Sequence, residues 1–128
     1  VYRWSREDAI DLAEAFIRKP GRHFVFLHVS GLDFVGPEHG WLSPEYMQEL
    51  SYIDEYLTPF IQLVKAQKNY LIIITSDHGG HDKIHGSQHP EDFRLPFVIH
   101  SDRMEFQSIR NSKYFVTDLK DILNRSLR

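Results

Sequence analysis

The sequence contains no cysteine. Disulfide scaffolds, thiol nucleophiles and thiolate zinc sites are therefore excluded, and the redox compartment stays open. The sequence also lacks an apolar run that approaches the roughly 18 residues of a membrane span, so no membrane-spanning segment is predicted. Three common motifs are missing as well: the Gly-x-Gly-x-x-Gly dinucleotide loop, the phosphate-binding P-loop and the Gly-x-Ser-x-Gly nucleophile elbow.

Neither sign of charge is in large excess, since 15 basic and 18 acidic side chains give a formal charge of -3. Proteins that bind nucleic acids or anionic membranes through bulk positive charge carry many more basic than acidic groups. We therefore expect no binding of that kind. The composition, with 41% hydrophobic and 26% charged residues, is that of an ordinary globular protein, and 128 residues without a linker or repeat predict a single domain.

Apolar spacing alternates between helical and strand periods along the chain. Helices are predicted from the Ser5 cap to Pro20-Gly21, from Ser43-Pro44 to Val64 with a kink or split at Pro59, and over 117–127. Buried strands are predicted at 24–29, 70–75 and 95–99. This order indicates an α/β domain, residues 1–128, with a mostly parallel sheet flanked by helices.

Carboxylate and imidazole side chains follow the first two predicted strands. Ligands bind at the carboxyl ends of strands in open α/β sheets, so these loops are where a site is expected. Mixed carboxylate and imidazole ligands suit zinc or another transition ion, and four of the eight histidines lie between residues 78 and 89. Each residue alone could equally be a turn or solvated loop residue. Together they predict a metal site; the candidates are Asp33, His39, Asp77, His78, His81, His85 and His89.

Four runs of residues resemble a known family. The run Ser76–His81, followed by His85-Gly86 and the stretch Pro90–Phe97, resembles the C-terminal half of the alkaline phosphatase superfamily, in its type I phosphodiesterase/nucleotide pyrophosphatase branch. The earlier run Asp33–Trp41 resembles the Asp-x-x-Gly-His segment of the same family. The resemblance covers about residues 22 to 100 and implies a partial alkaline-phosphatase-like core.

The resemblance also implies a ligand set, because two divalent metal ions hold a phosphate between them in that family. Asp77 and His78 would bind one ion, and Asp33 and His85 the other. Zinc is the ion we expect, with manganese or magnesium as alternatives. The substrate would be a small-molecule phosphoester.

Two parts of the family pattern are missing. The family has a histidine four residues after its first aspartate, and Pro37, which cannot coordinate a metal through its side chain, occupies that position here; His39, two residues on, is the reserve candidate for that ligand. The family's serine or threonine nucleophile and a further aspartate precede the first motif, and the 32 residues before Asp33 do not contain them. The resemblance thus implies the C-terminal, metal-binding portion of a longer phosphoester hydrolase, which needs its upstream segment. Alone, the chain is expected to be inactive, with partial or no metal occupancy.

Two other functions stay open at this point. The chain could be a non-catalytic relative that keeps the fold and binds a metal or a phosphate-bearing ligand. It could also be a histidine-rich structural or partner-binding domain that holds no ion. Metal content measured after incubation with zinc or manganese separates these hypotheses.

Overall fold

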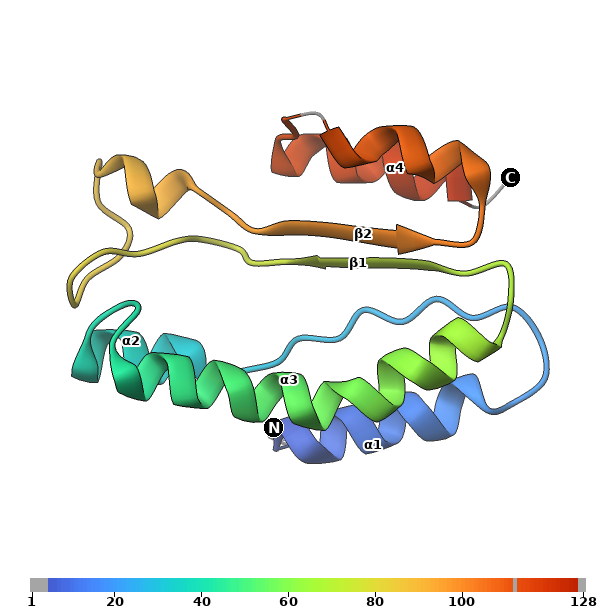
Figure 1. The fold of residues 1–128 in the computed structure, drawn as a ribbon, viewed down its shortest axis with the longest axis horizontal. Helices are drawn as coiled ribbons and strands as arrows, with labels where there is room; N and C mark the ends of the chain where they lie inside the picture. The colour runs from blue at the N-terminus through green and yellow to red at the C-terminus, as the bar shows by residue number, and fades with distance from the viewer. Residues whose placement is uncertain (1–4, 112, 127–128) are drawn as a thin grey trace.

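The structure, a computed structural model, describes residues 5–111 and 113–126. The helices are α1 (Arg6–Ile17), α2 (Leu32–His39), α3 (Pro44–Ala66) and α4 (Leu119–Ser126), with 3-10 helices η1 (Pro90–Phe93), η2 (Met104–Asn111) and η3 (Val116–Asp118). The strands are β1 (Leu71–Thr75) and β2 (Phe97–Ser101). Figure 1 shows the two strands between α4 on one side and the pair α1 and α3 on the other.

The α/β class is confirmed, but the mostly parallel sheet predicted from the sequence is wrong. β1 and β2 pair antiparallel, with Ile73 opposite Ile99, and they form a two-stranded sheet in the described part of the chain. Parallel neighbours need a crossover connection, usually a helix of a dozen or more residues. The connection from β1 to β2 contains only the four-residue η1, so the chain turns back and pairs antiparallel.

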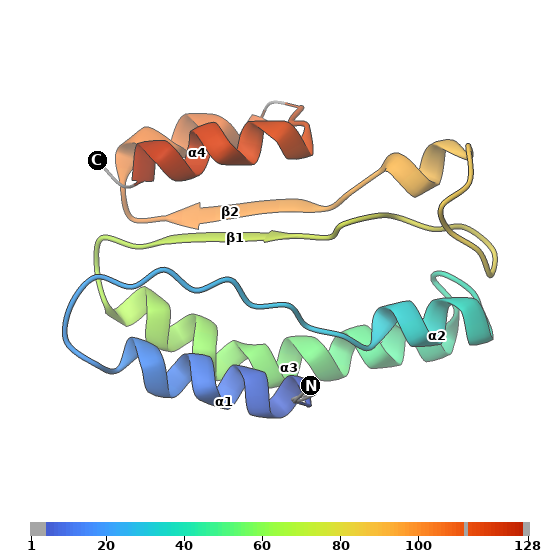
Figure 2. The same ribbon diagram turned by 180° about the vertical axis from the view of Figure 1, so that it is seen from behind.

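The predicted strand at 24–29 is extended but belongs to no strand ladder. Val25 and Leu27 pack on the core between α1 and α3, whereas Phe24 and Phe26 are 65% and 85% exposed. This alternation is that of an extended segment with one covered face, not of a central strand buried on both faces. In Figures 1 and 2 the segment runs beside β1 on the helical side.

One face of the two-stranded sheet is covered by η2 and α4. Strand residues on that face pack against the side chains of η2 and α4; the cluster comprises Leu71, Ile73, Phe97, Ile99, Phe106, Ile109 and Ile122. The predicted third strand is present two residues later than expected, and α4 begins at Leu119 after η3. The predicted helix end at residue 127 lies outside the described residues.

Local capping signals fix where α1 and α3 begin. Ser5 and Asp8 form a capping box at α1, as the sequence predicts, and the Ser43 hydroxyl accepts a hydrogen bond from Tyr46 N at α3. Of the kink or split predicted at Pro59, the split is wrong, because α3 continues to Ala66. A proline inside a helix costs about 3 kcal/mol. Packing of the next residue, Phe60, against α1 offsets that cost.

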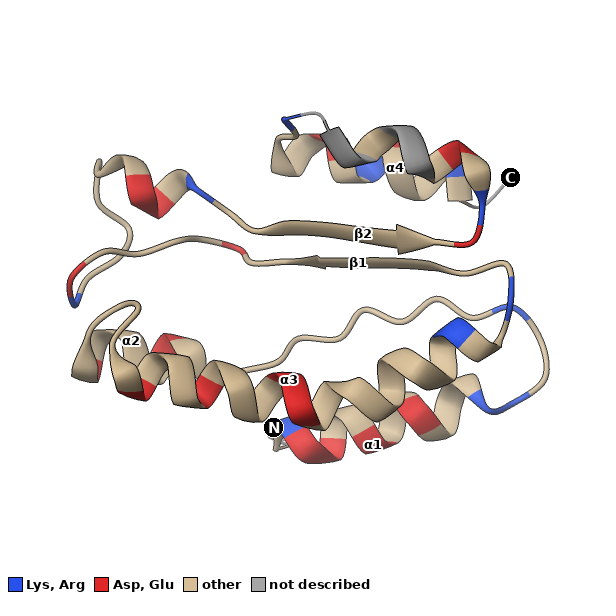
Figure 3. Cartoon of the chain, viewed as in Figure 1, with Lys and Arg blue, Asp and Glu red and all other residues tan. Residues whose placement is uncertain are grey.

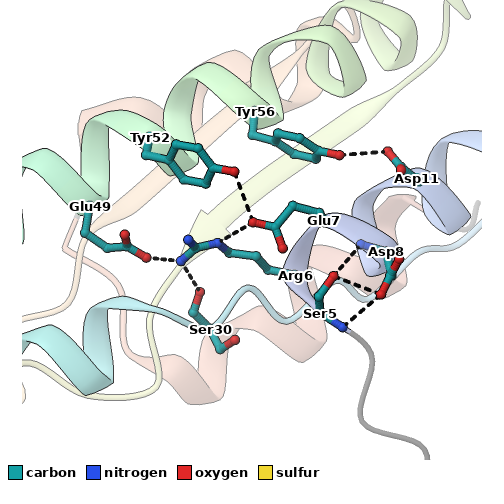
Figure 4. A network of polar contacts seen from close by, with 9 residues as sticks. All are labelled: Ser5, Arg6, Glu7, Asp8, Asp11, Ser30, Glu49, Tyr52 and Tyr56. Atoms are coloured by element: carbon teal, nitrogen blue, oxygen red, sulfur yellow. Dashed lines mark hydrogen bonds and ion pairs between the residues drawn. The ribbon is translucent and has the colours of Figure 1, made fainter.

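Polar contacts join the helical layer to the segment that leads into α2. Figure 4 shows Arg6 at the centre of this network, where its guanidinium pairs with the carboxylates of Glu49 and Glu7. It also donates to the carbonyl oxygen of Ser30 at 3.5 Å, and the Tyr52 hydroxyl donates to Glu7 at 3.2 Å. Arg6 therefore ties α1, α3 and Ser30, two residues before α2, together.

Acidic side chains line α1 and α3, and basic ones gather where these helices end (Figure 3). In α3, whose last turn carries Lys65, this distribution matches the helix dipole, which favours positive charge at the C-terminal end. Within the described ranges, no helix combines the length and the apolar character that crossing a membrane requires.

Candidate metal centre

The segments that carry the candidate residues meet at one end of the molecule, where α2 faces the loop that follows β1 (Figure 1). Asp33 lies in the first turn of α2, a helix that the sequence did not predict. Gly31, the residue at the helix start, has a φ of 139°, which side-chain-bearing residues rarely adopt. The chain can therefore turn sharply there, and Asp33 comes to lie against His78 and His85.

Asp33, His78 and His85 form a group whose ligand atoms all lie within 4.8 Å of one another. Asp33 Oδ1 is 3.5 Å from the Nε2 atoms of both histidines, and the two imidazole rings are stacked 4.2 Å apart with 6° between their planes. Two ligand atoms of a tetrahedral zinc ion lie about 3.4 Å apart, since each is about 2.1 Å from the metal. The two distances from Asp33 Oδ1 to the histidine Nε2 atoms thus match the spacing of neighbouring ligands on one tetrahedral ion.

The hydrogen bonding of His78 leaves Nε2, the ring atom that lies near Asp33, free to bind a ligand. His78 Nδ1 lies 2.8 Å from the carbonyl oxygen of Gly79. A carbonyl can only accept, so Nδ1 carries the ring proton and Nε2 keeps a lone pair. This arrangement, a backbone carbonyl that fixes the tautomer of a metal-binding histidine, is common in metalloproteins.

The group is open to solvent on one side. Its side chains are 61% (Asp33), 30% (His78) and 37% (His85) exposed. Tyr46 lies nearby, and burial together with the negative charge of Asp33 raises its pKa above the usual value. Because the three side chains are partly exposed, a small ligand can reach the group directly from solvent.

Trp41 connects the two segments that carry the group. An added Cβ would lie 2.9 Å from its ring at Gly36 and 2.2 Å at Gly80, so both glycines are needed for the ring to fit. Its backbone N–H donates to Asp82 O at 2.7 Å, and its ring lies 5.5 Å from the ring of His85. Trp41 thereby holds α2 against the loop after β1.

Asp77 and His39, the other two predicted ligands, lie outside this group. Asp77 Oδ1 is 3.8 Å from His78 Nε2, and its side chain is 82% exposed. His78 therefore lies between two carboxylates, and the structure groups it with Asp33 and His85 rather than with Asp77 alone. His39, at the end of α2, lies 3.6 Å from Glu38 and lines an open depression with Arg6 of α1, Val35 of α2 and residues of α3.

A second group comprises His81, His89 and Asp92. The sequence indicated both histidines as candidates but gave Asp92 no role. Asp92 is only 5% exposed. The available signal was the capping pattern, since His89 followed by Pro90 begins η1 and brings Asp92 back toward the loop.

Residues 2–92 match the family described as type I phosphodiesterase / nucleotide pyrophosphatase. The chain belongs to this family. The resemblance seen in the motifs is therefore confirmed, and the matched region also includes α1, which carries none of the motifs.

Curated relatives include three proteins named GPI ethanolamine phosphate transferase 1. The protein of Saccharomyces cerevisiae is 36% identical over 64% of this chain, that of Emericella nidulans 32% over 61%, and that of Mus musculus 30% over 75%. The aligned regions span only 9% to 11% of these relatives' own lengths. No solved structure gives a significant match.

Proposed function

We propose that Asp33, His78 and His85 bind a divalent metal ion that serves phosphoester chemistry. The observation that carries this proposal is the 3.5 Å distance from Asp33 Oδ1 to both Nε2 atoms, which suits neighbouring ligands of one tetrahedral ion. Family membership supports the same chemistry. One carboxylate and two imidazoles favour zinc over magnesium, which prefers oxygen ligands.

The bound ion would polarise a phosphoryl oxygen and neutralise negative charge on it. The residues of this chain orient the ligands: Gly79 O holds the His78 ring, and Trp41 holds the loop with His85 against α2. Because His78 has one free ring nitrogen and uses it for this ion, Asp77 is the remaining predicted ligand for the second ion of the family pattern, fewer than the three that a catalytic zinc site uses. We therefore expect the second ion to bind weakly or not at all in this chain.

Phosphoethanolamine is the group that the longer protein would transfer, in keeping with the names of the relatives in yeast, Emericella and mouse. Hydrolysis of a phosphodiester would use the same ligands, with water in place of the acceptor alcohol. The isolated chain has no residue that we assign as nucleophile. It should bind the metal without turning over a substrate.

The second candidate is a non-catalytic relative that binds a metal or a phosphate-bearing ligand. Pro37 favours it, because this residue of α2 occupies the position of a family ligand and cannot coordinate. His39 does not take over that role within the described group, since its ring lies beside Glu38.

Zinc titration of the purified chain tests the metal site. Wild type should bind one equivalent near neutral pH; Asp33→Asn and His85→Ala should each weaken binding by at least about 100-fold, because each removes one of three ligands. His39→Ala, an equally exposed histidine outside the group, is the matched control and should bind zinc normally. Near-zero stoichiometry in wild type, without a thermal shift, would contradict the proposal.

An activity assay separates the two candidates. Nitrophenyl phosphate monoesters and diesters should not be turned over by the isolated chain. When the chain is part of the longer protein, Asp33→Asn should abolish phosphoester turnover. Absence of turnover in the longer wild-type protein would favour the non-catalytic candidate, and turnover that persists unchanged in Asp33→Asn would contradict the proposed role of Asp33.

A further inference from the structure

Asp92 connects three points of the loop that follows β1. Its carboxylate accepts hydrogen bonds from His81 Nδ1 at 2.8 Å, from the Ser87 N–H at 2.6 Å and from the Ser87 hydroxyl at 2.8 Å. Its backbone carbonyl accepts a fourth from the Gly79 N–H at 2.9 Å. A buried carboxylate with this many donors is strongly held in place, and so are the residues that donate to it.

The two histidines of the proposed metal site lie directly beside these anchor points. His78 precedes Gly79, where an added Cβ would lie 2.1 Å from Glu91 O, so η1 packs directly against the backbone there. His85 lies between Ile84, which exchanges two backbone hydrogen bonds with His81 at 3.1 and 2.9 Å, and the Ser87 anchor. The backbone after His78 and on both sides of His85 is thus tied to Asp92, either directly or through His81.

We propose that Asp92 is a positioning residue that sets His78 and His85 at the spacing which the metal requires. The inference rests on the function proposed above. A carboxylate is needed because both of its oxygens accept, whereas an asparagine would turn an N–H toward one of the donors. Burial opposes ionisation of Asp92, but the hydrogen bonds from His81 and Ser87 outweigh it and lower its pKa to about 2.

His89 completes this arrangement. Its ring stacks on His81 at 3.9 Å with 19° between the planes, and its Nδ1 accepts from the Glu91 N–H at 3.3 Å. His81, His89 and Asp92 would themselves suit a metal ion by residue type. An ion there would have to displace the hydrogen bonds to Asp92 and His89, which hold the loop, so we assign the group to positioning.

Asp92→Asn and Asp102→Asn form a matched pair of variants for the 128-residue chain. The Asp102 carboxylate also accepts two backbone hydrogen bonds, from Asn69 at 2.6 Å and Tyr70 at 3.0 Å, but it lies at the opposite end of β1. Asp92→Asn should lower zinc affinity about 10- to 100-fold, the range for residues that orient metal ligands, and should change the visible spectrum of the cobalt-substituted chain. Asp102→Asn should destabilise the fold while leaving zinc affinity and spectrum unchanged.

The metal-free chain provides a second measurement, the NMR shifts of the His78 and His85 ring protons. The stacked rings shift each other's signals, and Asp92→Asn should remove this mutual shift whereas Asp102→Asn should not. Ser87→Ala removes a single donor and replaces Asp92→Asn if that variant does not fold; it should change affinity and shifts in the same direction, but less.

Two results would overturn the positioning role. One is an Asp92→Asn chain with wild-type zinc affinity, cobalt spectrum and ring-proton shifts. The other is the loss of a whole zinc equivalent in Asp92→Asn while the Asp33-dependent equivalent remains, which would make the second group a metal site. A wild-type chain that binds no zinc would refute the proposed function, and the ring-proton shifts would still decide the role of Asp92.

Discussion

Replacing Gly80 by alanine should disturb the metal site through Trp41. The added methyl group would lie 2.2 Å from Cε2 and 2.5 Å from Nε1 of the indole ring, whereas carbon atoms in contact are about 3.5–4.0 Å apart. Ring and loop must therefore separate by more than about 1 Å. The same ring lies against Gly36 of α2, where an added Cβ would lie at 2.9 Å, so α2 limits how far the ring can move.

The expected cost follows from overpacking, which typically destabilises a protein by about 1–3 kcal/mol. The displacement acts on His85, whose ring is 5.5 Å from the Trp41 ring, and on α2, which carries Asp33. If about 1.4 kcal/mol of this strain acts on the metal-binding group, the zinc affinity falls tenfold. Urea denaturation measures the stability, and competition with a chromophoric chelator measures the zinc affinity.

Two further variants make the prediction specific. In Gly80→Ala combined with Trp41→Ala, the clash is gone, so the double variant should be more stable than the sum of the single effects predicts. Gly21→Ala introduces strain at a φ of 119° but meets nothing within 4 Å, and it should leave zinc affinity unchanged. The reasoning is refuted if Gly80→Ala stays within about 0.5 kcal/mol of wild type and binds zinc normally, or if the two substitutions are simply additive.

Three further predictions concern the rest of the fold. The hydrogen bond from the Asn69 N–H is the main cause that lowers the pKa of Asp102. The ionised carboxylate therefore stabilises the fold above about pH 3.9, the pKa of an aspartate in the unfolded chain. This stabilisation is lost as the pH falls toward the lower pKa of Asp102 in the folded chain. Urea unfolding of Asp102→Asn at about pH 7 and about pH 3 should accordingly show a smaller acid-induced loss than wild type, and an equal loss would contradict the assignment. Phe106, which is 2% exposed, should cost about 3–5 kcal/mol when replaced by alanine, as measured by thermal or urea unfolding. Leu27→Ala should cost about 1–2 kcal/mol because the side chain is partly buried, whereas Phe26→Ala should stay within about 0.5 kcal/mol; the reverse order would show that the wrong face of the segment is covered.

Local signals in the sequence predicted the long helices but not α2. Ser5 with Asp8 and Ser43 before a proline define the starts of α1 and α3 through hydrogen bonds to residues within the next turn. α2 has only eight residues, contains Pro37 and has no side-chain cap, so no local pattern indicates it. Its position depends on Trp41 and Arg6, contacts that only the folded chain brings together.

The strands were predictable as apolar runs, but their direction was not. Leu71–Thr75 reads as a strand whichever way its neighbour runs, because the apolar pattern of a strand carries no information about pairing. The parallel sheet was inferred from the alternation of helices and strands, yet the connection from β1 to β2 has no crossover helix. The order of elements alone therefore predicted the class and not the topology.

The sequence predicted that the loops carrying Asp33, His78 and His85 form one site, and the reason for this prediction holds without a parallel sheet. The segment 24–29 and β1 run toward the same end of the molecule, so the residues that follow them meet there (Figure 1). Asp92 was not predictable in this way. Its burial depends on hydrogen bonds to residues 79, 81 and 87, which neither helical nor strand periodicity relates to it.

The four histidines between residues 78 and 89 show why residue type alone could not assign their roles. They form two interleaved stacked pairs, His78 with His85 at 4.2 Å and His81 with His89 at 3.9 Å, and the ligand atoms of each pair group with those of one aspartate, Asp33 or Asp92. The first aspartate, Asp33, is 61% exposed and faces two Nε2 atoms. The second has a side chain 3% exposed and accepts from backbone and side-chain donors of the loop. A buried carboxylate must be satisfied by hydrogen bonds, while an exposed one beside two imidazoles can exchange water for a metal ion. The burial of the carboxylate therefore distinguishes the pair that would bind the ion from the pair that holds the loop.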